Sequence, residues 1–214
     1  MVPQLKAYLI IAVFLSLASG ALICGQKTDS LSRWIVDRDD KVGAISSKTT
    51  EGALVRMYGR KNVTHGTLDI GEGETMPATI LFADIPLQRL EIAWKDEPAR
   101  TLPARIQIQG EKSLWKTSQG ITLGITLKSL EKLNGGSFTL AGFGWDYSGT
   151  VTSWNKGRLE GDMKNVVVRL GPAVSSETPS ADEESVEGDA EFPSSHSSMQ
   201  KVNPKVYQLI WLFE

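Results

Sequence analysis

The residues from Gly120 to Phe138, GITLGITLKSLEKLNGGSF, hold the pattern from which the fold is predicted. Thr126 precedes leucines at positions 127, 130 and 133, and Gly135 follows them. Threonine is a common N-cap residue, and apolar residues at this spacing share one face of a helix. Glycine readily adopts the left-handed conformation that ends a helix. The stretch therefore predicts a short amphipathic helix that begins after Thr126 and ends at Gly135.

An earlier stretch, VGAISSKTTEGALVRMYGRKNV from Val42 to Val63, is built in the same way, with Thr50 as the cap and Gly59 as the terminator. A shift of 76 residues lays one stretch on the other, and a duplication of this kind predicts a repeated structural unit. The same shift lays the alternating apolar residues at 90, 92 and 94 over those at 166, 168 and 170. The identical pairs are Ile45 and Ile121, Thr50 and Thr126, Leu54 and Leu130, Gly59 and Gly135, and Gly66 and Gly142.

The predicted fold class is α+β, with two repeats that each consist of a helix followed by about four antiparallel strands. The two units are expected either to share one sheet or to juxtapose their sheets. We place the first repeat at residues 41–115 and the second at 116–214. Runs rich in apolar residues, Arg105–Gln109 and Val206–Phe213, are predicted to be the last strands of the two units.

The second unit is longer because of one segment, Ser175–Gln200, which holds eight serines, two prolines and seven acidic residues without Lys or Arg. Such a composition predicts an exposed, disordered insertion. Its acidic residues lack the glycine-punctuated spacing of a calcium loop.

The N-terminus has the pattern of an export signal: one lysine, an apolar run from Tyr8 to Ala18, and then small residues. We predict a signal peptide at residues 1–20 and a linker at 21–40. Two alternatives stay open, a lipoprotein that carries its lipid on Cys24 and an uncleaved N-terminal anchor. All three place the domain outside the cytoplasm, in the periplasm or cell envelope, and only the last two attach it to the membrane.

The composition excludes several classes of protein. The 23 basic and 25 acidic residues give a net charge of −2, which argues against a nucleic-acid binder with a broad basic face. One cysteine cannot form an internal disulfide, and two histidines offer little for a metal site. We therefore predict neither a metal nor a cofactor.

The candidate binding residues are Phe143, Trp145, Asp146, Tyr147 and Trp154. If residues 143–147 form a strand, its three aromatic side chains share one face of the sheet. They are a recognition surface if that face is open, and core residues if it faces a helix. Asp146, on the opposite face, is predicted to hydrogen-bond the turn at Ser148 and Gly149.

Two Ser-x-x-Lys strings, Ser113 to Lys116 and Ser129 to Lys132, have the spacing that can activate a serine nucleophile. They carry the alternative hypothesis of a serine hydrolase. Because the pattern is short and no partner motif accompanies it, we do not predict an enzyme.

The strings Gly120–Gly135 and Phe138–Gly149, the latter FTLAGFGWDYSG, resemble a family of bacterial exported proteins and lipoproteins of unassigned activity. At a coarser level the predicted units resemble the outer-membrane assembly lipoproteins of BamE/SmpA type and, in tandem, the secreted β-lactamase inhibitor proteins. These resemblances imply a non-enzymatic binding or scaffolding protein but do not identify its partner. From the export signal and this expected role, we predict an envelope or secreted protein as the partner. The remaining alternative is a purely structural module.

Overall fold

The computed structural model describes residues 34–37, 41–172 and 179–214, and its largest element is a six-stranded antiparallel sheet. The predicted signal peptide, residues 1–20, and the alternative lipid-attachment residue Cys24 lie outside the described residues. In spatial order the sheet consists of β11 (Val166–Gly171), β13 (Lys205–Leu212), β7 (Thr101–Gln109), β6 (Leu90–Asp96), β5 (Glu74–Leu81) and β4 (Val63–Gly71).

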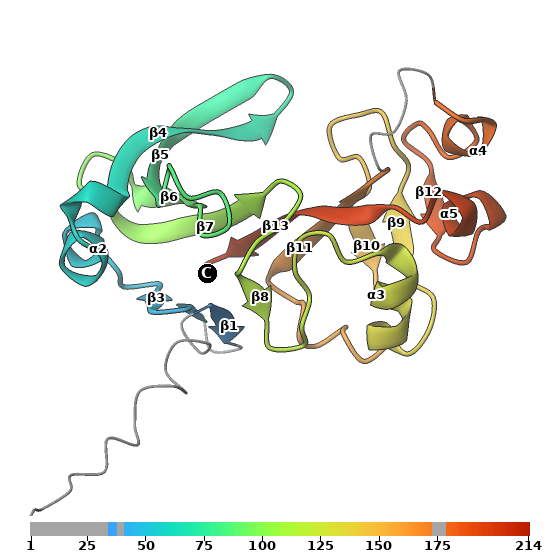
Figure 1. Ribbon diagram of the computed structural model, residues 1–214, viewed down its shortest axis with the longest axis horizontal. Helices are drawn as coiled ribbons and strands as arrows, with labels where there is room; N and C mark the ends of the chain where they lie inside the picture. Colours follow the sequence, from blue (N-terminus) through green and yellow to red (C-terminus); the bar gives the residue numbers. More distant parts are fainter. Residues whose placement is uncertain (1–33, 38–40, 173–178) are drawn as a thin grey trace, which may run out of the picture.

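Within the described residues, two smaller sheets and five short helices accompany it (Figure 1). One small sheet has the order β3 (Ile45–Ser46), β2 (Lys41–Val42), β1 (Ile35–Asp37) and β8 (Lys116–Thr117); the other has the order β10 (Val151–Ser153), β9 (Thr139–Ala141) and β12 (Glu191–Pro193). The helices are α2 (Glu51–Tyr58), the 3₁₀-helix η1 (Arg60–Asn62), α3 (Leu127–Asn134), α4 (Ala181–Glu184) and α5 (Ser197–Val202). The predicted α+β class is confirmed.

Both predicted helices form where their caps place them. The Thr50 hydroxyl accepts a hydrogen bond from the Ala53 N–H, and the Thr126 hydroxyl accepts one from the Ser129 N–H. Gly135 ends α3 in the left-handed conformation, at φ 79° and ψ 15°. These contacts satisfy backbone groups that a helix end leaves without partners, which is why such short helices form at these positions.

One face of the six-stranded sheet is covered by α2 and α3, and the main core lies between them. Alternate residues of each strand point to this face, as the pleat of a sheet requires. The helices contribute Leu54, Leu127 and Leu130, and the strands contribute Leu90, Ile92, Trp94, Ile106, Ile108, Val168, Leu170, Leu209 and Trp211.

The opposite face, which we call the hairpin face, is partly covered by the β4–β5 hairpin. The register pairs β4 with β5 from Val63 to Gly71, but β5 pairs with β6 only over Thr79–Leu81. The rest of the hairpin therefore leaves the sheet, and Leu68, on β4, packs in a second buried cluster with Ala93 of β6. The hairpin turn then lies near the loop that follows β9 (Figure 1).

The prediction left open whether the two four-stranded units share one sheet or only lie side by side. Strands from both halves of the chain join one sheet, in which β7 and β13 are antiparallel neighbours. Arg105 pairs with Leu212 at one end of this contact, and Gln109 pairs with Gln208 at the other. Two strands of the second half, β9 and β10, instead form the three-stranded sheet with β12. Part of the predicted 21–40 linker is also ordered, since β1 pairs with β2 and β8.

The prediction of a disordered insertion at 175–200 is wrong for its described part, residues 179–200. The strand β12 pairs with β9, and Val186 and Met199 are fully buried in the main core. The polar residues find partners instead of water: the buried Ser194 hydroxyl donates to Glu131 Oε1 at 2.6 Å and accepts from the Phe138 N–H at 3.0 Å. The composition predicted disorder because it shows neither the few apolar side chains that enter the core nor the serines that find hydrogen-bond partners. These contacts are enough to fix the segment against α3 and β9.

Within the described ranges, no helix is long and apolar enough to cross a membrane.

Candidate functional site

The aromatic residues at 143, 145 and 147 do not form one stripe, because the chain from 142 to 149 is a loop after β9 and not a strand. Phe143 and Trp154 are buried in the main core, whereas Trp145 and Tyr147 are 36% and 54% exposed. Gly144 and Gly149 take positive φ angles, of 84° and 64°, so the alternation of a strand is lost. The predicted aromatic stripe is therefore wrong, and the loop divides it into core residues and surface residues.

The two exposed rings form a pair. The ring centroids of Trp145 and Tyr147 are 5.3 Å apart, in an edge-to-face arrangement with an interplanar angle of 64°. The Trp145 indole Nε1 donates to the Gly142 carbonyl oxygen at 3.0 Å, which ties the ring to its own loop. The pair is thus held in place on the surface before any partner binds.

Asp146 joins this loop to the hairpin turn. Its Oδ1 accepts a hydrogen bond from the Glu72 backbone N–H at 3.1 Å, across 74 residues of sequence. The predicted contact with the turn at Ser148 and Gly149 is not formed, because the Ser148 N–H bonds to the Trp145 carbonyl and the Gly149 N–H to that of Gly142. Only the tertiary structure brings Asp146 to its partner.

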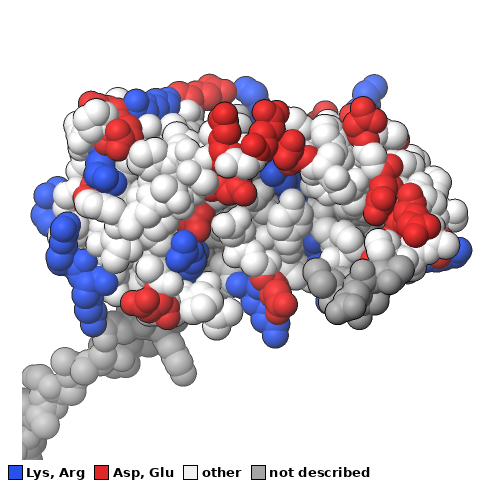
Figure 2. Space-filling model, turned by 90° about the horizontal axis from the view of Figure 1, so that it is seen from above, with Lys and Arg blue, Asp and Glu red and all other residues white. Residues whose placement is uncertain are grey.

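A pocket of about 210 Å³ lies where the hairpin turn and the loop meet. Its wall combines an aromatic ring and an exposed isoleucine with three carboxylate side chains. Seen from above, from the side on which the hairpin lies in Figure 1, acidic side chains gather near the middle of the surface (Figure 2). The lining residues are Ile70, Gly71, Glu72, Glu74, Asp146 and Tyr147. We call the exposed residues Ile70, Glu72, Glu74, Trp145, Asp146 and Tyr147 the loop–hairpin surface.

One basic side chain, Arg169, lies next to this surface. The guanidinium carbon of Arg169, on β11, lies 6.0 Å from the centroid of the Tyr147 ring, within the range of a cation–π contact. Sequence reasoning did not find Arg169. An arginine in a strand carries no local signal, and its proximity to Tyr147 depends on how the loop folds over β11.

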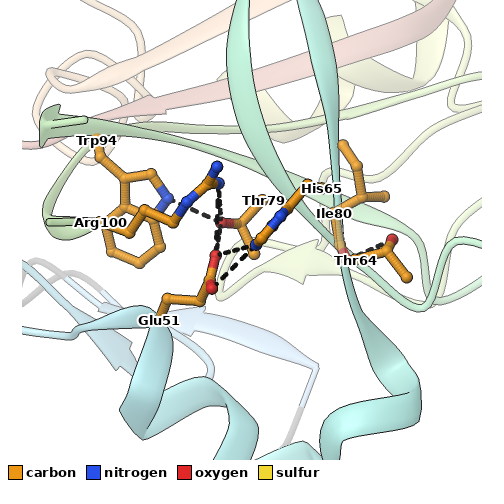
Figure 3. A network of polar contacts seen from close by, with 7 residues as sticks. All are labelled: Glu51, Thr64, His65, Thr79, Ile80, Trp94 and Arg100. Carbon is orange, nitrogen blue, oxygen red and sulfur yellow. Dashed lines mark hydrogen bonds and ion pairs between the residues drawn. The ribbon is translucent and has the colours of Figure 1, made fainter. Parts of the chain in front are cut away.

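A second polar cluster lies at the start of α2 (Figure 3). The Glu51 carboxylate accepts from the Thr79 hydroxyl at 2.7 Å, lies 3.0 Å from His65 Nε2 and forms an ion pair with Arg100 at 3.5 Å. The Trp94 indole N–H donates to the Thr79 hydroxyl at 2.9 Å. Sequence reasoning missed this cluster, because its members come from α2, β4, β5, β6 and the turn between β6 and β7.

This cluster does not have the arrangement of a catalytic triad. Thr79 is fully buried, and its hydroxyl donates to Glu51 and not to a histidine that would activate it. The contacts instead hold the first residue of α2 against β4, β5 and the β6–β7 turn, where a carboxylate also suits the helix dipole. We interpret the cluster as an anchor for α2.

Acid is expected to weaken this anchor. Burial raises the pKa of Glu51, but hydrogen bonds from Thr79 and His65 and the charges of His65 and Arg100 outweigh it, so the pKa is lowered overall. A carboxyl whose pKa is lower in the folded state stabilises the protein above its ordinary pKa, and that stabilisation is lost as the pH falls through the folded value. We therefore expect Glu51→Gln to destabilise the protein at pH 7 and to cost progressively less below about pH 4.5.

Urea unfolding of the wild type and of Glu51→Gln between pH 7 and pH 3 measures how the loss of stability depends on pH. The control is Glu111→Gln, which alters an exposed carboxylate that forms no ion pair with a described residue. A destabilisation by Glu51→Gln that stays constant across this pH range would contradict the assignment.

The two serines of the hydrolase alternative make local contacts. The Ser129 hydroxyl accepts from the Thr126 hydroxyl at 3.0 Å, beside the cap of α3, and the Ser113 hydroxyl accepts from the Trp115 N–H at 3.1 Å. Among the described residues, neither is hydrogen-bonded to a lysine. No observation therefore favours this alternative.

In the ranges that the structure covers, no group of three or more His, Cys, Asp or Glu side chains is placed to hold a metal ion. Comparisons with protein-family models, with curated proteins and with solved structures find no match.

Proposed function

We propose that this chain is a non-enzymatic, extracytoplasmic binding protein that docks an envelope or secreted protein on the loop–hairpin surface. The observation that carries the proposal is the preorganised pair of Trp145 and Tyr147, exposed beside a pocket. Large aromatic side chains whose conformation is already restricted lose little entropy on binding and are frequent hot spots of protein interfaces.

The proposed location rests on the export pattern at residues 1–20, with lipid attachment at Cys24 or an uncleaved anchor as the alternatives. Mass spectrometry of the mature N-terminus distinguishes them. A start at Ala21, a lipidated Cys24 and an intact Met1 each give a different mass.

We also infer that the fold arose from two related units, because the strand order is consistent with a duplication. In each half a capped helix precedes the strands that enter the six-stranded sheet, and α2 and α3 cover the same face of that sheet. The last strands of the two halves, β7 and β13, pair with each other, and β6 and β11 flank them on either side. Such an arrangement joins two helix-and-strand units through their final strands, as the resemblance to tandem BamE/SmpA-type repeats implies.

The proposed function predicts the effect of removing the aromatic pair. Trp145→Ala and Tyr147→Ala should each weaken partner binding about tenfold or more, since truncation of a central interface aromatic commonly costs about 2 kcal/mol. The tagged protein is cross-linked in envelope fractions, and captured proteins are quantified by mass spectrometry for the wild type and both variants.

Leu114→Ala, which truncates another exposed apolar residue, is the matched control and should capture the partner at the wild-type level. Capture that is unchanged in both aromatic variants would refute this surface. Enrichment of no protein over the tag alone would favour a purely structural module.

A further inference from the structure

The hairpin face carries arginine and glutamine side chains on three adjacent strands. The register places Gln208 of β13 beside Arg169 of β11, and Leu212 of β13 beside Arg105 of β7. Their neighbours in sequence, Ile106, Val168 and Leu209, point to the opposite face and belong to the main core. Arg105 and Arg169 therefore extend from the same face of the sheet, and each is partly exposed.

A carboxylate on this face is already engaged by other groups. Glu91 Oε1 accepts from Arg89 Nε at 3.0 Å and from its Nη2 at 2.9 Å, while Oε2 accepts from the buried Gln107 amide at 2.8 Å. Arg105 donates through Nη2 to Gln107 Oε1 at 2.6 Å. Arg89 is thus neutralised by a paired carboxylate, but Arg105 reaches only an amide.

The two other arginines lack partners for buried donors. Nε of Arg105 and Nε of Arg169 are both buried without a hydrogen-bond partner, as is Oε1 of Gln208 between them in the strand order. Among the described residues, neither Arg105 nor Arg169 forms an ion pair. Buried polar groups are nearly always satisfied, so unpaired donors on positively charged groups indicate a missing acceptor.

The two charges also affect each other. Burial lowers the pKa of Arg105, and the positive charge of Arg169 lowers it further, while Asp69 and Glu91 act in the opposite direction. Two like charges that share a partly desolvated region repel each other. An anion between them would remove this repulsion and supply acceptors for both Nε–H groups.

We propose that Arg105 and Arg169 together bind an oxyanion, a carboxylate or a phosphate, on the hairpin face beside Tyr147. A guanidinium offers a planar fork of donors that matches the oxygens of either group. This site adjoins the loop–hairpin surface through the contact of Arg169 with Tyr147, but it does not depend on a protein partner. It would give the surface a preference for ligands that carry an oxyanion.

Nuclear magnetic resonance of the arginine Nε–Hε groups tests the site directly. The ¹⁵N-labelled protein is titrated with sodium acetate and, separately, with sodium phosphate, while sodium chloride keeps the ionic strength constant. We expect saturable shifts of the Arg105 and Arg169 resonances and none at Arg89, whose Nε is occupied by Glu91. The probe that saturates at the lower concentration identifies the preferred oxyanion.

The variants Arg105→Gln and Arg169→Gln assign the resonances and should each abolish the saturable shift at the remaining arginine. If a variant does not fold, triple-resonance spectra assign the arginine Nε–Hε groups of the wild type, and its titration with Arg89 as internal control still decides the question. Shifts that do not saturate, or that are equal at Arg89, would overturn the proposal. Trp145→Ala should leave the titration unchanged, so failure of this site is distinguishable from failure of the proposed function.

Discussion

Gly149→Ala is expected to destabilise the protein by about 3 kcal/mol or more, among the largest effects of a single substitution. Gly149 has a φ angle of +64°, where a side chain is strained, and an added Cβ would lie 1.7 Å from the Leu170 carbonyl oxygen. That oxygen belongs to β11 and cannot move aside freely, because the Leu170 N–H also bonds to the Gly149 carbonyl at 2.9 Å. The clash is therefore with backbone on both sides.

Urea or thermal unfolding measures the loss, and Gly161→Ala is the matched control. A Cβ added at Gly161 meets no atom within 4 Å, and its φ is not in the left-handed region. The control should stay within about 0.5 kcal/mol of the wild type, as surface substitutions usually do. Equal stabilities of the two variants would mean that the loop does not approach β11 as described.

Trp115→Ala is expected to cost about 3–5 kcal/mol, the range for removal of a large aromatic from a core. Trp115 is fully buried, and its ring meets that of Trp34 edge to face at a centroid distance of 4.8 Å. Its indole N–H also donates to the Gln88 carbonyl oxygen at 2.9 Å, so truncation leaves both a cavity and an unpaired acceptor.

Leu114→Ala is the matched control, because Leu114 is the residue next to Trp115 and its side chain is 42% exposed. Leu114→Ala should change the free energy of unfolding by less than about 1 kcal/mol. Urea unfolding of both variants measures the two free energies of unfolding. A small loss of stability in Trp115→Ala would mean that its ring lies outside the core.

The two helices could be predicted because the groups that define them are close in sequence. Thr50 and Thr126 each cap a backbone N–H three residues ahead, and Gly135 ends its helix with a bond to the Glu131 carbonyl. The strands at 90–96 and 166–171 were recognisable for a similar reason, since alternate burial leaves a period of two in the sequence.

The candidate site could be predicted only in part. Aromatic residues at 145 and 147 mark an exposed cluster, but the same local reasoning placed Phe143 with them, and it is buried. Two glycines with positive φ turn the loop, and this divides the ring positions between core and surface. The hydrogen bond from the Glu72 N–H to Asp146 spans 74 residues, a separation at which no local pattern indicates contact.

The described part of the acidic segment shows the same limit. Its serines and carboxylates predict solvation when each is considered alone, yet Ser194 is buried on Glu131, and Asp182 accepts from Ser198 at 2.9 Å and from Lys201 at 3.0 Å. Such pairing offsets the cost of burying polar groups, and it depends on residues from other elements.

The sequence by itself determined the capped helices, the alternating strands and the α+β class, because short-range hydrogen bonds and side-chain periodicity act within a few residues. The tertiary structure decided that both halves share one sheet, that Trp145 and Tyr147 stay exposed, and that Arg105 and Arg169 lie on one face without acceptors. Strand register and loop closure set these features. Both depend on pairing between residues far apart in the chain, and the proposed binding surface is made from them.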